Sequence, residues 1–241
     1  MIIMEIKKNL LYKRSCFIND SIKIMIPTVG EVIDDEENYF SIISILTAMP
    51  IDMMVQLDDI GIDFTSITDY DLFLLMFQGL KNRDTRLIFG DLDLSKFKHA
   101  INEQNGNMVL YDKENQITID RAIYEKISET LRIINHLEKN RHKPANPEAK
   151  EFMLKRARNK MRRKNNHIKG SIIEPLIISM VNTEQYKYNF ESTRELSIYQ
   201  FNESVRQVIR KVDYNNLMYG VYTGNVNSKE ISQDKLNWLS Q

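Results

Sequence analysis

Two aspartates lie two residues apart at Asp91 and Asp93, a spacing at which carboxylates could share a divalent cation. Two-metal nucleases hold Mg²⁺ or Mn²⁺ with side chains of this kind. Further aspartates cluster at Asp58, Asp59 and Asp63. None of them matches a calcium-binding loop, and the clusters coincide with expected helix starts, where aspartate is a favoured capping residue. Capping or surface exposure therefore explains them better than a metal-dependent nuclease does.

The other reactive side chains lack the spacing that catalysis or metal binding needs. No histidine pair has the separation of a metal site, and no phosphate-binding glycine loop or nucleophile motif occurs. Cys16 falls in an expected strand, where a buried thiol behaves as a small hydrophobic side chain. We therefore expect no enzymatic activity, no metal and no cofactor. The four histidines are His99, His136, His142 and His167.

A basic stretch is the strongest chemical signal in the chain. Residues 140–170 carry 11 basic and 2 acidic residues, whereas residues 1–100 carry 10 basic and 16 acidic ones. A helix with this charge could neutralise nucleic-acid phosphates, dock on an acidic protein surface, including the N-terminal half of the same chain, or simply be solvated. Aromatic residues for base stacking are not interleaved with the charges. The candidate partner-binding cations are Lys155, Arg156, Arg158, Lys160, Arg162, Arg163 and Lys164.

The single tryptophan, Trp238, lies near the C-terminal end of the sequence. A tryptophan concentrates binding energy when it inserts into a partner. Burial against its own chain would instead stabilise the terminus. Both roles are open from the sequence, and Trp238 is the second candidate contact.

The N-terminal 139 residues predict a mixed α+β region. Alternating isoleucines over 22–26 indicate a strand, and the Asn19-Asp20 turn would pair it with an earlier strand over residues 10–18. Thr28 with Glu31 has capping-box spacing for a helix entry after Pro27. Three helices are expected over 38–80, the third capped by Ser66 or Thr68. Short apolar runs at 87–89, 108–111 and 117–119 predict a small antiparallel sheet, followed by a long helix capped by Asp120 or Thr118.

The C-terminal region is expected to be helical. Residues 140–146 resemble a linker, and Asn146 followed by Pro147 predicts the start of a basic helix that ends near residue 164. Ser197 and Gln200 have capping-box spacing, and apolar residues recur at intervals of three and four through Val212. A separate short helix would follow through residue 217.

The expected organisation is an α+β region over 1–139, a linker over 140–146 and a helical region over 147–241. The fold class is α+β, predominantly α-helical, with a small N-terminal strand pair and a short antiparallel sheet.

Composition sets the broad class. The chain has 241 residues, 33 Lys+Arg against 33 Asp+Glu, and 42% hydrophobic residues, which is enough for a substantial core. One cysteine excludes a disulfide framework. Neither an apolar run of roughly 20 residues nor the order of a signal peptide is present. A soluble, intracellular product is therefore expected.

Several short segments resemble proteins of the tail module of tailed bacteriophages and prophages from low-GC Gram-positive bacteria. They are KIMIPTVGE (23–31), PIDM (50–53), LDDIGID (57–63), TDYDLF (68–73), LIFGDLD (87–93), FNESV (201–205), GVYTG (220–224) and LNW (236–238). The resemblance covers most of the chain and includes no catalytic centre. It implies a component of the tail or baseplate, or a tail assembly chaperone.

The resemblance and the residues together predict a non-enzymatic structural or assembly protein that acts through protein–protein contacts. Its partners would be other tail or baseplate proteins. It would reside in the host cytoplasm during assembly, and also in the virion tail if it is a tail component and not an assembly chaperone. The alternative is a nucleic-acid-binding protein that uses the basic helix over residues 146–164.

Overall fold

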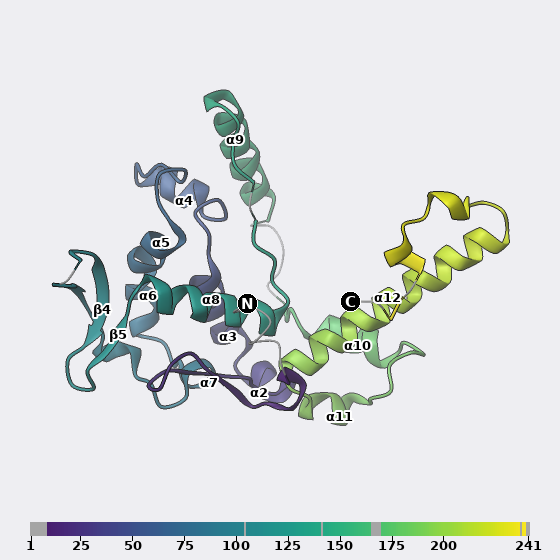
Figure 1. The fold of residues 1–241 in the computed structure, drawn as a ribbon, viewed down its shortest axis with the longest axis horizontal. Helices are drawn as coiled ribbons and strands as arrows, with labels where there is room; N and C mark the ends of the chain where they lie inside the picture. Colours follow the sequence, from purple (N-terminus) through teal and green to yellow (C-terminus); the bar gives the residue numbers. More distant parts are fainter. Residues whose placement is uncertain (1–8, 104, 141, 165–169, 237, 240–241) are drawn as a thin grey trace.

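A computed structural model describes residues 9–103, 105–140, 142–164, 170–236 and 238–239 of the chain (Figure 1). It confirms the predicted α+β class, with a two-stranded sheet near the N-terminus and a three-stranded antiparallel sheet further along. None of the described helices combines the length and the hydropathy that a membrane span requires. The N-terminal elements are a 3₁₀ turn at Leu10–Tyr12, β1 (Ser15–Phe17), β2 (Lys23–Met25), α2 (Val29–Asp34), α3 (Glu36–Thr47), α4 (Met54–Asp59), α5 (Asp69–Met76) and α6 (Gln78–Lys81).

The N-terminal strand pair forms, but its first strand is only Ser15–Phe17, and the first residues of the expected strand, Leu10–Tyr12, form a 3₁₀ turn instead. β1 and β2 are antiparallel, with Cys16 opposite Ile24. The Asn19 side chain accepts hydrogen bonds from the backbone N–H groups of Ser21 and Ile22, at 3.0 and 2.7 Å, and so closes the turn. Cys16 is buried, and burial raises the pKa of its thiol. A neutral thiol of this kind packs as a hydrophobic side chain.

The starts of α2 and α5 follow the capping residues that the sequence predicts. Thr28 and Glu31 form a reciprocal capping box at the start of α2, with bonds of 3.1 and 2.6 Å. Thr68 and Asp71 form the same arrangement at α5, so Thr68 rather than Ser66 is the cap. Such a cap contributes about 1 kcal/mol because it satisfies backbone donors that the first helical turn leaves unpaired.

The small sheet differs from expectation at one strand. Residues 87–89 belong to a short helix, α7 (Arg86–Phe89), and the remaining strand is β3 (Lys98–Ile101). The Asp84 carboxylate accepts bonds from the backbone N–H and the side chain of Arg86, which fixes a helical turn there, and Gly90 ends it at a φ of 61°. β3 is an edge strand with mostly exposed side chains, so it lacks the apolar alternation that marks a strand in a sequence. The other elements here are a 3₁₀ turn at Leu94–Lys96, β4 (Met108–Asp112) and β5 (Ile117–Ile119).

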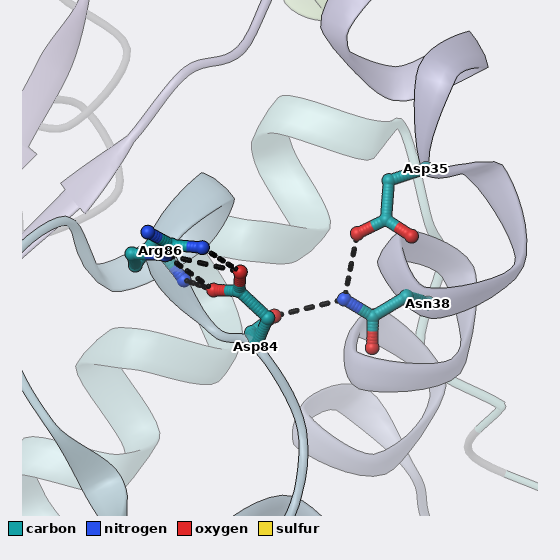
Figure 2. A network of polar contacts seen from close by, with 4 residues as sticks. All are labelled: Asp35, Asn38, Asp84 and Arg86. Carbon is teal, nitrogen blue, oxygen red and sulfur yellow. Dashed lines mark hydrogen bonds and ion pairs between the residues drawn. The ribbon is translucent and has the colours of Figure 1, made fainter.

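A polar network connects the start of α3 to the segment before α7 (Figure 2). The side-chain amide of Asn38 donates to the Asp35 carboxylate and to the Asp84 backbone carbonyl, both at 2.8 Å. The hydrogen bonds from Arg86 lower the pKa of Asp84 to about 2. Two segments 46 residues apart are thereby held together at the surface.

The core is built around α8 (Arg121–Asn135), whose cap is Asp120, one of the two candidates that the sequence offers. The α8 residue Tyr124 stacks on Phe73 of α5, with ring centroids 4.4 Å apart. The Tyr70 hydroxyl donates to the backbone carbonyl of Ile119 at 3.0 Å, and Tyr39 donates to the Asn135 side chain at 2.9 Å. These aromatic residues join α3, α5, α8 and β5 into one hydrophobic unit.

The C-terminal half adds α9 (Pro147–Lys164), α10 (Glu174–Val181), α11 (Phe190–Glu195) and α12 (Ile198–Tyr222), followed by 3₁₀ turns at Ser228–Glu230 and Gln233–Leu236. Ser197 and Gln200 form the expected capping box of α12. However, α12 is a single helix of 25 residues, so the expected separate helix after Val212 is wrong. No glycine or proline interrupts residues 212–219, and the chain turns only at Gly224, where φ is 75°. Figure 1 shows that α9 and the distal part of α12 extend away from the body.

One buried hydrophobic cluster contains residues from before and after the expected linker. It includes Leu10 and Ile24 near the N-terminus as well as Ile177 and Phe201 in the C-terminal half. α10 and the first turns of α12 therefore share the main core with the strand pair and α8. The division of the chain at residues 140–146 remains a prediction.

Candidate functional site

The basic helix α9 begins where its capping residue predicts. The Asn146 side chain accepts a hydrogen bond from the Ala149 N–H at 2.7 Å, and its backbone carbonyl accepts one from the Lys150 N–H at 3.1 Å. Pro147 occupies the first helical position, where no N–H is needed. The local sequence thus places the basic residues on a continuous helix.

The inner face of α9 packs on α4 and the neighbouring loops. Met153 and Leu154 contact a small hydrophobic cluster that is distinct from the main core. The buried members of that cluster are Ala48, Ile51, Leu57, Phe64 and Leu72. An apolar strip on one side of a highly charged helix is therefore used for packing within the chain.

Two cations of α9 bind the acidic N-terminal half of the same chain. The Arg158 guanidinium lies 2.6 Å from an Asp58 oxygen and 2.7 Å from an Asp59 oxygen. The Lys150 ammonium lies 2.7 Å from Asp63 and 5.7 Å from the ring centroid of Phe64. The hydrogen bond from Lys150 lowers the pKa of Asp63 to about 2. The clustered aspartates at 58, 59 and 63 therefore form ion pairs with α9. Arg158 is thus already paired within the chain.

The opposite side of α9 is exposed and basic. In the described part of the chain, no carboxylate pairs with any of its five described cations, and we call this surface the outer face of α9. The outer face consists of Lys155, Arg156, Lys160, Arg162 and Arg163. Phe152 lies among them with 66% of its surface exposed. Lys164 ends the helix, but its side chain is outside the described part of the structure.

Trp238 packs on its own chain. The Lys211 ammonium of α12 lies 4.3 Å from the centroid of the indole ring, within cation–π range. Val208 and Gln207 of α12 line a cavity of about 350 Å³ beside the half-buried ring. Of the two roles open to Trp238, contact with its own helix is the one that the structure displays. A contact with a partner remains a prediction.

A polar cluster at the junction of α8 and α12 was not predicted from the sequence. His136 Nε2 lies 3.2 Å from a Glu203 oxygen, and Arg206 also pairs with Glu203. Burial, with the nearby Glu203 charge, raises the pKa of Tyr199 to about 12. Arg132 is buried and donates to the backbone carbonyls of Thr47 and Glu138. Two of these contacts, His136 with Glu203 and Arg132 with Thr47, join residues 67 and 85 positions apart, so they leave no local signal in the sequence.

The Asp91 and Asp93 carboxylates each contact a group of the same chain. Asp93 accepts a hydrogen bond from the Ser95 N–H at 2.9 Å and so caps a 3₁₀ turn, while Asp91 lies 3.8 Å from the Lys23 ammonium. Among the described residues, no three His, Cys, Asp or Glu side chains form a group that could hold a metal ion. His99 Nε2 lies 3.2 Å from the Leu74 carbonyl, whereas His167 lies outside the described residues.

The comparisons with known proteins identify one similarity. Residues 165–241 match a family model described as the YomV second domain. YomV is a Bacillus prophage-type protein, so the match connects the C-terminal third of the chain with a phage-associated family. No curated protein and no solved structure matches the chain.

Proposed function

We propose that this chain is a non-enzymatic structural or assembly protein of a phage tail or baseplate, which acts through protein–protein contacts. The outer face of α9 and the Trp238 segment would be its contact surfaces. Its site of action would be the host cytoplasm during assembly, and then the virion tail. The similarity of residues 165–241 to the YomV second domain supports the phage association.

The observation that carries the proposal is the division of charge on α9. Lys150 and Arg158 are paired with aspartates of the same chain, whereas the five cations of the outer face are exposed and pair with no carboxylate in the described part of the chain. A helix whose inner face is already seated presents its outer face in a fixed orientation. Such a surface suits an acidic surface on a neighbouring protein, because complementary charge steers association and selects the partner.

Charge reversal on the outer face tests the proposal. The triple variant Arg156→Glu, Arg162→Glu and Arg163→Glu should lose co-purification with tail or baseplate proteins from infected or induced cells. Arg158 is left intact because it holds α9 in place. A matched control reverses three exposed lysines elsewhere, Lys98, Lys113 and Lys126, and should retain the partners. Retention by the α9 variant would refute the proposed contact.

A second candidate function is nucleic-acid binding by the same face. Phe152, Arg156, Asn159 and Arg163 recur at intervals of four, three and four, which aligns them along one ridge of the helix. Arginine and asparagine are the side chains that read guanine and adenine edges. Five phosphate contacts would give a log–log salt dependence with a slope of about −4.5 on duplex DNA, and a flat response would exclude this function.

Affinity purification distinguishes the two functions. Recovery is compared at about 50 and about 500 mM salt, with and without nuclease, because phosphate contacts weaken steeply as salt rises. Tail or baseplate proteins that co-elute after nuclease treatment would support the assembly function. Recovery of nucleic acid alone, with loss at the higher salt, would support the second candidate.

A further inference from the structure

The polar cluster at the junction of α8 and α12 borders a cavity of about 290 Å³, which we call the junction cavity. Its wall is formed by the last turns of α8, the residues that follow them and the first turns of α12. Two arginines line it, Arg132 of α8 and Arg206 of α12. Small-molecule sites have volumes of roughly 300–1,000 Å³, so the junction cavity has the size of a site for a small ligand.

Both arginines of the junction cavity have a buried hydrogen-bond donor without an acceptor. Four buried side-chain polar atoms in the described part of the chain lack a partner, and two of them are the Nε atoms of Arg132 and Arg206. A buried donor is costly when it is left unpaired, so folded proteins satisfy such groups with protein atoms, water, an ion or a ligand. Two unpaired donors on the residues that line one cavity indicate that an acceptor belongs in it.

The charge of Arg132 makes an anion the appropriate acceptor. Only 5% of this residue is exposed, and its guanidinium donates to the backbone carbonyls of Thr47 and Glu138. None of the carboxylates in the described part of the chain forms an ion pair with it. A guanidinium stays protonated in a protein, so burial cannot remove its charge. Because a buried charge needs a counter-charge, the missing partner of Arg132 is an anion and not only a neutral acceptor.

The carboxylates that border the junction cavity are already paired or exposed. They are Glu129, Glu138 and Glu203. Glu129 lies 3.6 Å from the Lys139 ammonium, and Glu203 contacts both Arg206 and His136 Nε2. Glu138 is exposed to solvent. Among the groups at the cavity that the structure describes, Arg132 is therefore the buried charge without a counter-charge.

The rest of the cavity wall is apolar or aromatic. It is formed by Ile133, Leu137 and Tyr199. A ligand with a hydrocarbon part would lie against these side chains, because apolar surface gains free energy when it leaves water. The combination of two guanidinium groups with an apolar wall is typical of a site that holds one anionic head group and a short apolar body.

We propose that the junction cavity binds a small organic anion, whose carboxylate or phosphate group accepts hydrogen bonds from the guanidinium groups of Arg132 and Arg206. This inference does not depend on the phage assignment or on the outer face of α9. Charge-assisted hydrogen bonds of this kind are stronger than those between neutral groups. The Arg206 side chain is 38% exposed whereas Arg132 is buried, so the ligand enters from the side of Arg206.

Titration of the full chain with butyrate and, separately, with inorganic phosphate tests the site and distinguishes the two head groups. In NMR spectra the Nε–H signals of Arg132 and Arg206 should shift and saturate, with a dissociation constant on the order of 1 mM for a ligand of this size. Sodium chloride at matched ionic strength is the control and should leave both signals in place. Saturation by butyrate, by phosphate or by both supports the site and identifies the head group that it accepts. Signals that neither anion moves, or that chloride moves equally, would overturn the proposal.

A charge-conserving substitution tests the role of the guanidinium. Arg206→Lys keeps a cation beside Glu203 but removes the Nε–H and the planar donor group. Loss of a hydrogen bond between charged groups should weaken binding about tenfold or more, whereas the secondary structure should not change. Arg121→Lys is the matched control, because Arg121 lies on the same helix as Arg132 and pairs with Glu125 at the surface. Arg132 is left unchanged because it also binds two backbone carbonyls. Equal affinities of Arg206→Lys and the wild type would refute the site.

Discussion

Because α9 packs against the N-terminal half, truncation of Leu154 should weaken that contact and let α9 detach more often. Leu154→Ala removes three carbons from a half-buried side chain that contacts the cluster around Leu57 and Phe64. Each fully buried methylene contributes about 0.8 kcal/mol, so the loss at a half-buried site is about 1 kcal/mol. The equilibrium between seated and detached α9 should therefore shift about fivefold toward the detached state.

Hydrogen exchange of the α9 amides measures this shift directly, because exchange from a detached helix reports the local opening free energy. Amides between residues 152 and 160 should exchange about fivefold faster in Leu154→Ala, whereas those of α8 should not change. Phe152→Ala is the matched control, since Phe152 is 66% exposed on the outer face. Both variants introduce alanine, so helix propensity does not disfavour either. Equal exchange rates in the wild type and Leu154→Ala would refute the seating of α9 on this cluster.

Two further predictions concern caps and pH. Thr68→Ala removes the capping box of α5 and should lower the free energy of unfolding by about 1 kcal/mol in urea titrations, whereas Ser66→Ala should have a smaller effect because Thr68 is the cap. The pKa of Asp63 is lowered to about 2, so the contact with Lys150 is fully present above the unfolded pKa near 4 and is lost as the pH falls toward 2. Exchange of the α9 amides, corrected for the intrinsic pH dependence, should rise in that window; unchanged protection down to pH 2 would contradict the role of this pair.

The polar cluster at the base of α12 could not be predicted from the sequence. His136 and Glu203 are 67 positions apart, and neither lies in a motif that indicates the other. The structure brings them together because α8 and α12 pack against each other, which places His136 Nε2 3.2 Å from a Glu203 oxygen. No periodicity or composition signal reports a pair of this kind.

Local signals predicted the helical framework well. Thr28, Thr68, Asp120, Asn146 and Ser197 all cap helices at the positions where their spacing indicates a cap. A cap is a contact over three residues, so the sequence alone contains all of its partners. The strand predicted at residues 87–89 is wrong because a short apolar run is compatible with a strand or a helical turn, and the run itself does not distinguish the two.

The sequence by itself determined that the chain has a basic helix, where that helix begins, and that an apolar seam runs through the first half of α12. Only the tertiary structure decided which charges of α9 are used within the chain, because Arg158 and Asp58 are 100 positions apart. It also decided where the seam of α12 is covered and where it is open. Periodicity specifies the faces of a helix, but the surface that covers each face is set by long-range packing, and that packing is a property of the whole fold.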